Sequence, residues 1–184
     1  MVSTFPLSDK NSTEIYLTQN SIEFHVSLIK LSNLLFLQTV NHVPVANIPA
    51  MLETVKFEGV YADTKFAKNL FLYDKKKKER LWLVICAHDT AFSMKALEKS
   101  FGIKNGDLRG ADPEILESTL GVKGGSVNLF AIINDKDNKV KLVIDHTLLN
   151  NFEYVGFHPM QNDYTTAIKR ESVQKIIDLS HHEA

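Results

Sequence analysis

The sequence predicts a single α/β domain in which a mixed, strongly curved sheet is flanked by helices. Its 184 residues, 44% of them hydrophobic, suit one core of ordinary size. Strand-like runs at residues 66–73 and 81–87 occur among segments with helical patterns, such as residues 112–121. These strands and helices follow no regular βαβ repeat, and this favours a mixed sheet over a fully parallel one.

The chain begins with a polar stretch that precedes the first regular elements. Residues 1–14 are rich in turn-forming residues, so we expect a leader or linker there and a domain over residues 15–184. Apolar side chains recur at helical spacing within residues 21–34, which predicts a helix. Residues 36–40 predict a strand that leads into His42.

A hairpin with a charged tip is expected next. The runs at residues 66–73 and 81–87 enclose the segment 74–79, which carries four consecutive lysines. Two interpretations of this tip stay open from the sequence alone. It is either a solvated turn or a contact for RNA phosphates.

Capping residues indicate where several helices begin and end. Asn47 and Pro49 predict a short helix, because a proline in the first turn loses no hydrogen bond. A serine cap and a following glycine bound a helix over residues 93–101. An aspartate, a proline and a glutamate begin the helix over residues 112–121.

The last third of the chain predicts a second hairpin and a closing helix. Residues 130–133 and 140–144 would form this hairpin around a polar turn. The remaining expected elements are strands at residues 154–157 and 165–168 and a helix at residues 171–179.

Composition excludes several classes of function. The formal net charge of −1 argues against a DNA-binding protein held by a broad basic surface, although a contact with one end of an RNA fits. Neither a signal peptide nor a membrane-spanning apolar run is present, so no membrane partner is expected. The single cysteine, Cys86, cannot form a disulfide framework, which favours a cytoplasmic location. Its apolar surroundings favour a buried strand residue over a catalytic thiol.

Common catalytic and metal-binding motifs are missing. The sequence has no phosphate-binding P-loop, no dinucleotide fingerprint and no metalloprotease motif. His181 and His182 are the one thin metal candidate, and adjacent histidines on a fraying tail make a poor closed site. We therefore expect no metal.

Lys68 is the first of three features that favour ester chemistry. Alternation along a strand puts Lys68 on the side of Leu70 and Leu72, and Asn69 on the side of Phe71. An inward lysine is usually paired or lines a cleft, because an unpaired buried ammonium is costly. The alternative is that Lys68 lies at the start of the strand and reaches solvent.

The other two features are a glycine pair and a histidine before a proline. Gly124 and Gly125 would let the backbone approach a ligand and present N–H groups, or they form an ordinary tight turn. Pro159 restricts the backbone before it and so directs the His158 ring. A neutral imidazole there would donate to a carbonyl or order a water. The alternative is that His158 is a half-buried structural residue.

Taken together and in order, these stretches resemble the YbaK/ProX family of aminoacyl-tRNA deacylases. The matching blocks are Lys68–Leu72, then Leu120–Val127 with Phe130 and Ile133–Asp135, and finally Phe157–Pro159 with Asn162 and Thr165–Ile168. The asparagine–aspartate pair and the phenylalanine–histidine–proline block look closest to the ProX branch, which removes alanine from proline tRNA.

The resemblance implies a trans-editing deacylase that hydrolyses the ester of mischarged tRNA(Pro), with alanine as the amino acid. It implies no cofactor. Its partners would be the acceptor end of the aminoacylated tRNA and prolyl-tRNA synthetase or a multi-synthetase complex. The alternatives are a binding module of the same fold with weak turnover, and a deacylase for another amino acid such as cysteine.

The resemblance also implies which residues act. Backbone amides at Gly125 would hold the ester carbonyl or a water, Lys68 would anchor the terminal phosphate or the ester, and His158 would orient the substrate. The implied substrate-binding residues are Asn69, His42, Gly124, Ser126, Asn162 and Thr166. Asn47 and Gly124 depart from the residues usual in this branch, which leaves the choice of amino acid open.

Overall fold

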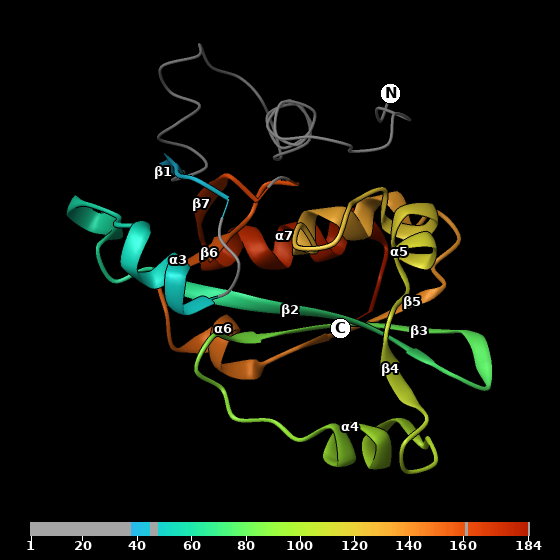
Figure 1. Cartoon of the computed structure of the whole chain (residues 1–184). Helices are drawn as coiled ribbons and strands as arrows, with labels where there is room; N and C mark the ends of the chain where they lie inside the picture. The colour runs from blue at the N-terminus through green and yellow to red at the C-terminus, as the bar shows by residue number, and fades with distance from the viewer. Residues whose placement is uncertain (1–37, 45–47, 161, 184) are drawn as a thin grey trace.

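The computed structural model describes residues 38–44, 48–160 and 162–183. Within these residues, seven strands form one sheet with helices on both faces (Figure 1). The strands are β1 (Gln38–Asn41), β2 (Lys65–Asp74), β3 (Lys77–Ala87), β4 (Leu108–Gly110), β5 (Val140–Ile144), β6 (Tyr154–Phe157) and β7 (Tyr164–Lys169). The helices are α3 (Ile48–Thr54), α4 (Met94–Phe101), α5 (Pro113–Leu120), α6 (His146–Asn150) and α7 (Arg170–Ser180), with 3-10 turns η1 (Gly59–Tyr61) and η2 (Leu129–Asn134).

The sheet is mixed, as the sequence predicts. Its strand order is β1-β7-β6-β2-β3-β5, and β4 pairs with β2 outside this path. Strands β2 and β3 form the long antiparallel hairpin, while β2 with β6 and β3 with β5 are parallel pairs. The expected α/β domain with a mixed sheet is therefore confirmed.

Side-chain alternation along β2 divides the core between the two faces of the sheet. One face carries the large cluster, in which Phe71 and Phe157 pack beneath α5, η2 and α7. The other face carries two small clusters, one around Phe66 under α3 and one around Trp82 under α4. Lys68 lies on this second face, between the two small clusters.

The edge of β2 that faces β6 changes its partner along its length. Strand β6 pairs there with Lys65 and Phe66, and β4 pairs with residues 72–74. Because β3 already occupies the opposite edge at Leu72, β4 must lie on the β6 side. Over residues 67–70 the described residues provide no strand partner on this edge. We call this stretch the β2 gap.

The structure confirms three of the expected helix caps, while Asp112 precedes α5 without a side-chain capping hydrogen bond. The Ser93 side chain accepts a hydrogen bond from Ala96 N at the start of α4, and Gly102 ends that helix with a φ of 64°. Gly121 ends α5 in the same left-handed conformation, with a φ of 66°. The expected helix over residues 21–34 and the Asn47 cap lie outside the described residues.

The second predicted hairpin is wrong. Residues 130–133 belong to the 3-10 turn η2, and β5 pairs with β3 in parallel instead. All residues from Leu129 to Ile133 are buried, so this run has no apolar–polar period that would separate a strand from a helical turn. The Asn128 side chain accepts from Ala131 N at 3.2 Å and holds the turn closed. Two further elements, β4 and α6, were not predicted.

Among the described residues, the helices are all too short or too polar to cross a bilayer.

Candidate functional site

His42, Thr165 and His158 form a hydrogen-bonded cluster beside the ends of β1, β6 and β7. The Thr165 Oγ1 atom lies 2.9 Å from His42 Nε2 and 3.3 Å from His158 Nδ1. The two rings lie 5.8 Å apart between centroids. Thr165 is fully buried, while His158 is partly exposed. A segment after β1 and a turn before β7, far apart in sequence, therefore meet at one polar cluster.

The partners of each ring nitrogen fix the direction of the hydrogen bonds. His158 Nδ1 lies 2.8 Å from Tyr164 O, and His42 Nδ1 lies 2.8 Å from Val43 O. A carbonyl oxygen can only accept, so both Nδ1 atoms carry a proton. Within the described part of the chain, His158 Nε2 has no hydrogen-bond partner. In a neutral ring this nitrogen offers a lone pair.

Burial favours the neutral form of His158. Loss of solvent lowers the pKa of its imidazole, and the proximity of His42 lowers it further. The hydrogen bond to the Tyr164 carbonyl and the charge of Asp163 oppose this shift only in part. The His158 ring is therefore suited to accept a hydrogen bond at neutral pH.

Gly124 and Gly125 occupy the centre of a tight turn. Ser126 N donates to Lys123 O at 3.0 Å, and Gly125 has a φ of 84°, a combination typical of a type II turn. A Cβ atom at Gly125 would lie 3.3 Å from Asn162 Nδ2. The turn thus approaches the loop that follows His158, and it consumes the N–H group of Ser126.

Asn128 fastens this turn to the His158 loop. Its Nδ2 atom donates to Ser126 O at 2.7 Å and contacts Met160 Sδ at 3.4 Å. Asn128 and Ser126 are both buried. The glycine turn therefore has a fixed position relative to the loop that carries His158 and Asn162.

Lys68 lies on the face of β2 that the alternation predicts. Its Nζ atom donates to Thr90 O at 3.4 Å and lies 4.5 Å from the centroid of the Phe92 ring. Phe92 is 41% exposed, so this aromatic side chain covers the ammonium from the solvent side.

Lys68 and His158 occupy equivalent places on neighbouring segments. Phe66 pairs with Gly156 in parallel register, and Lys68 and His158 each lie two residues further along. Side chains two residues apart lie on the same face of a strand, so Lys68 and His158 both lie on the face of Phe66. Lys68 and His158 therefore flank the β2 gap from its two sides.

Asn69 and Thr166 point to the opposite face from Lys68 and Thr165. Asn69 lies between Ala67 and Phe71, which both belong to the large core. Its Oδ1 atom is buried and has no hydrogen-bond partner in the part of the chain that the structure describes. The Thr166 hydroxyl pairs with Thr39 Oγ1 at 2.9 Å.

The predicted residues therefore divide into groups. His42 and His158 share one cluster, and Gly124, Gly125 and Ser126 form one turn beside Asn162. Lys68 belongs to the part of β2 that borders the β2 gap, and its ammonium lies against Thr90 O and Phe92, which follow β3. Sequence reasoning missed Thr165, although alternation through the strand at residues 165–168 separates it from Thr166. It also missed Phe92, whose exposed ring has no periodic pattern around it.

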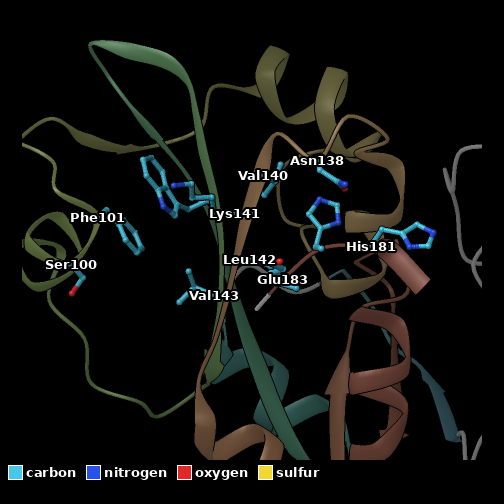
Figure 2. Close-up of a pocket in the computed structure, with 11 residues that line it drawn as sticks. Ser100, Phe101, Asn138, Val140, Lys141, Leu142, Val143, His181 and Glu183 are labelled. Carbon is cyan, nitrogen blue, oxygen red and sulfur yellow. The ribbon is translucent and has the colours of Figure 1, made fainter. Parts of the chain in front are cut away.

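One cavity of the described residues lies elsewhere. It has a volume of about 750 Å³ and runs along β5 between Phe101 of α4 and the C-terminal residues His181 and Glu183 (Figure 2). None of the predicted site residues lines it. Lys141, His181, His182 and Glu183 line it, but neither Lys68 nor His158 does, and we therefore place the candidate site at the β2 gap.

Cys86 and His182 are buried structural residues. Loss of solvent raises the pKa of the Cys86 thiol, which supports its interpretation as a core residue. His182 Nε2 lies 3.0 Å from Asp135 Oδ2, and His182 Nδ1 lies 2.9 Å from Ser180 O. The prediction of a fraying tail is therefore wrong for His182. No group of three or more His, Cys, Asp or Glu side chains suited to a metal occurs among the described residues.

Comparison with known proteins identifies relatives over most of the chain. A family model described as an aminoacyl-tRNA editing domain matches residues 42–176. Prolyl-tRNA synthetase associated domain-containing protein 1 of Bos taurus is 33% identical over 148 residues, which cover 79% of this chain and 82% of that protein. Its Xenopus laevis counterpart is 35% identical over 143 residues, covering 77% and 82%.

A solved structure shows the same fold. A candidate trans-editing enzyme for prolyl tRNA synthetase superposes with a TM-score of 0.55 at 15% identity, covering 77% of this chain and 81% of that one. At this identity the likeness concerns the fold alone.

Proposed function

The chain belongs to the aminoacyl-tRNA editing domain family, and from this membership we propose that it hydrolyses the ester of mischarged tRNA(Pro) in trans. Alanine is the amino acid we propose, and the 3′ acceptor end of the tRNA is the part recognised. Relatives named after an association with prolyl-tRNA synthetase support the choice of tRNA and suggest that synthetase as a partner. Such a role belongs in the cytoplasm.

The arrangement of Lys68 and His158 around the β2 gap carries this proposal. One supplies a cation and the other a neutral ring with a lone pair on Nε2. An aminoacyl ester is already activated, so hydrolysis chiefly needs a positioned water and a stabilised oxyanion. These two side chains offer both contributions without a protein nucleophile.

Each group has a distinct role in the proposed reaction. Lys68 binds the phosphate or the ester oxygen of the terminal nucleotide. His158 Nε2 accepts a hydrogen bond from the ribose hydroxyl next to the ester or from the attacking water. As the water adds to the carbonyl carbon, its proton passes to the ribose oxygen that leaves, so that the free amino acid and the uncharged tRNA result. The other proposed substrate contacts are His42, Asn69, Gly124, Ser126, Asn162 and Thr166.

The glycine turn offers N–H groups to the developing oxyanion. Ser126 N is engaged with Lys123 O, so the donors that remain in this turn belong to Gly124 and Gly125. A side chain at Gly125 would be strained by its positive φ and would crowd Asn162. The close approach of Gly125 to Asn162 thus supports a backbone contact with the substrate.

The lysine-rich hairpin tip is a second point where RNA would bind. Residues 75–78 are exposed, and of their side chains Lys76 pairs with Asp107 at 3.4 Å. The β2–β3 hairpin is anchored below the tip, where Arg80 contacts Asp74 at 3.1 Å. We propose that this rigid arm contacts tRNA phosphates, an interaction that weakens as salt rises.

Single-turnover deacylation tests the function directly. With enzyme in excess, tRNA(Pro) charged with alanine should be hydrolysed, and tRNA(Pro) charged with proline should remain intact. Cysteine and serine esters on the same tRNA test the choice of amino acid. Binding of tRNA without hydrolysis of any ester would favour the alternative of a binding module with weak turnover.

A further inference from the structure

We propose that Thr165, together with His42, is a positioning residue that holds His158 in a single tautomer with its Nε2 lone pair directed to the β2 gap. This inference rests on the proposed function, because it takes His158 as a group that contacts the substrate. It concerns residues that do not themselves contact the reacting atoms. Thr165 would act through His158 alone.

Thr165 is built into the sheet at a place where only a short hydroxyl can reach both rings. It belongs to β7, where it pairs with Val40 of β1, and its side chain is fully buried. Its Oγ1 atom is 2.9 Å from His42 Nε2 and 3.3 Å from His158 Nδ1. A buried hydroxyl between two imidazoles links their proton positions.

With both rings neutral, one set of proton positions satisfies all these contacts. His158 Nδ1 donates to Tyr164 O and shares its proton with Thr165 Oγ1. The Thr165 hydroxyl must then donate to His42 Nε2, because His42 Nδ1 already donates to Val43 O. In this row, the His158 proton is shared between two acceptors, the Thr165 hydroxyl has one, and this direction is fixed while both rings are neutral and the two backbone carbonyls stay in place.

Removing the hydroxyl would disturb both histidines. Without Thr165 Oγ1, His42 Nε2 would lose its donor in a place where His42 is 7% exposed. The His42 ring would then have to turn to reach another donor, which would move it relative to the His158 ring, whose centroid lies 5.8 Å away. The titratable groups that face His158 are His42, after β1, and Asp163, before β7.

The experiment compares Thr165→Val with Thr165→Ser. Valine keeps the volume and removes the hydroxyl, whereas serine keeps the hydroxyl. We expect Thr165→Val to lower the single-turnover rate on the order of 10-fold with little change in KM, a smaller loss than the roughly 100-fold or more expected when a proton-transfer group is removed. Thr165→Ser should restore most of the rate. The pH profile of Thr165→Val should shift, while that of Thr165→Ser should follow the wild type.

A readout independent of turnover uses the ring nitrogens of His158. Nitrogen-15 NMR of the full chain reports the tautomer and the titration of His158, assigned through His158→Gln. We expect one tautomer with a protonated Nδ1 in wild type and Thr165→Ser, and a mixture or a shifted titration in Thr165→Val. Thr64→Val is the matched control, because it removes a buried hydroxyl that donates to Tyr61 O. It should leave the His158 signals unchanged.

A double variant tests the link between the two partners. If Thr165 and His42 act as one row, Thr165→Val combined with His42→Phe should slow the reaction no more than the stronger single change. Additive losses of rate in the double variant would contradict a joint action of Thr165 and His42. Unchanged His158 signals and a wild-type rate in folded Thr165→Val would overturn the proposal. An inactive wild type would refute the proposed function, and the NMR comparison would still decide the role of Thr165.

Discussion

Two histidines of this protein, the buried His182 and the half-buried His158, lie in contrasting surroundings. His182 has acceptors at both ring nitrogens, Asp135 Oδ2 at 3.0 Å and Ser180 O at 2.9 Å. His158 has Tyr164 O and Thr165 Oγ1 at Nδ1, and its Nε2 has no hydrogen-bond partner among the described residues. A histidine whose hydrogen-bonding capacity is used up stabilises the fold, whereas one with a nitrogen left over is available to a ligand. The contrast separates structural from functional candidates without reference to sequence motifs.

The largest expected effect is on turnover at the β2 gap. His158→Gln keeps a polar side chain but loses the imidazole lone pair, so the single-turnover rate should fall by about 100-fold or more. The variant also loses the Nδ1 contacts with Tyr164 O and Thr165 Oγ1, so the rate is compared for protein shown to be folded by urea unfolding. A wild-type rate would place His158 in the same class as His182.

Lys68→Ala should lower the rate by a similar or slightly smaller factor, roughly 100-fold, through loss of charge stabilisation at the ester. Lys68→Arg is the matched variant, since it keeps the charge and tests whether position matters as well. Circular dichroism of both proteins would show whether the fold is intact. A near-normal rate in Lys68→Ala would mean that this lysine only solubilises the strand.

The structural histidine is tested through its partner. Asp135→Ala leaves His182 and Val140 N without their acceptor, and should lower the free energy of unfolding by about 3–5 kcal/mol. Asp135→Asn keeps an acceptor and should cost less. Urea unfolding measures both, and the deacylation rate of the folded fraction should stay at the wild-type value. A loss of rate without a loss of stability would contradict the separation of the two regions.

The smallest effect concerns pH, and the pH range in which stability falls identifies each region. The pKa of His158 is lowered from 6.5, so below about pH 6.5 the unfolded chain binds a proton that the folded chain resists, and stability falls as the pH drops. The pKa of Asp135 is lowered from 3.8 by its hydrogen bonds to His182 and Val140 N, although burial opposes them. Its contribution is complete above that value and is lost as the pH falls through the folded pKa.

Urea unfolding of the wild type, His158→Gln and Asp135→Asn over a series of pH values separates the two windows. His158→Gln should flatten the decline that begins near pH 6.5, and Asp135→Asn should flatten the acid part. If His158→Gln instead flattened the acid part and Asp135→Asn the part near pH 6.5, the assignment of these pH ranges to His158 and Asp135 would be wrong.

Local signals predicted much of this fold, while contacts between distant segments were harder to foresee. The β2–β3 hairpin and the ends of α4 and α5 follow from neighbouring residues and were confirmed. The turn η2 was mistaken for a strand because a uniformly apolar run has no period, and the parallel pairing of β3 with β5 joins segments far apart.

The same limit applies to the candidate site. Lys68, Gly125 and His158 stand out by their neighbours in sequence, and their roles stay predictions that the experiments above test. Thr165 does not stand out, since a threonine beside another threonine carries no chemical signal of its own. Its importance depends on which face of β7 it occupies relative to two histidines from other segments. Only the contacts in the folded structure show that Thr165 lies on the same face as these histidines.

The β2 gap has a consequence for how substitutions along this strand should behave. A β-sheet normally separates the side chains on its two faces, so the effects of substitutions alternate from residue to residue along a strand. At the β2 gap, where the described residues provide no strand partner on one edge of β2, this separation is incomplete, and the side chains of Lys68 and Asn69 border the gap from opposite faces. In a scan of single substitutions along β2, the effects on stability should therefore not alternate between neighbouring residues at Lys68 and Asn69. They should alternate again toward Leu72.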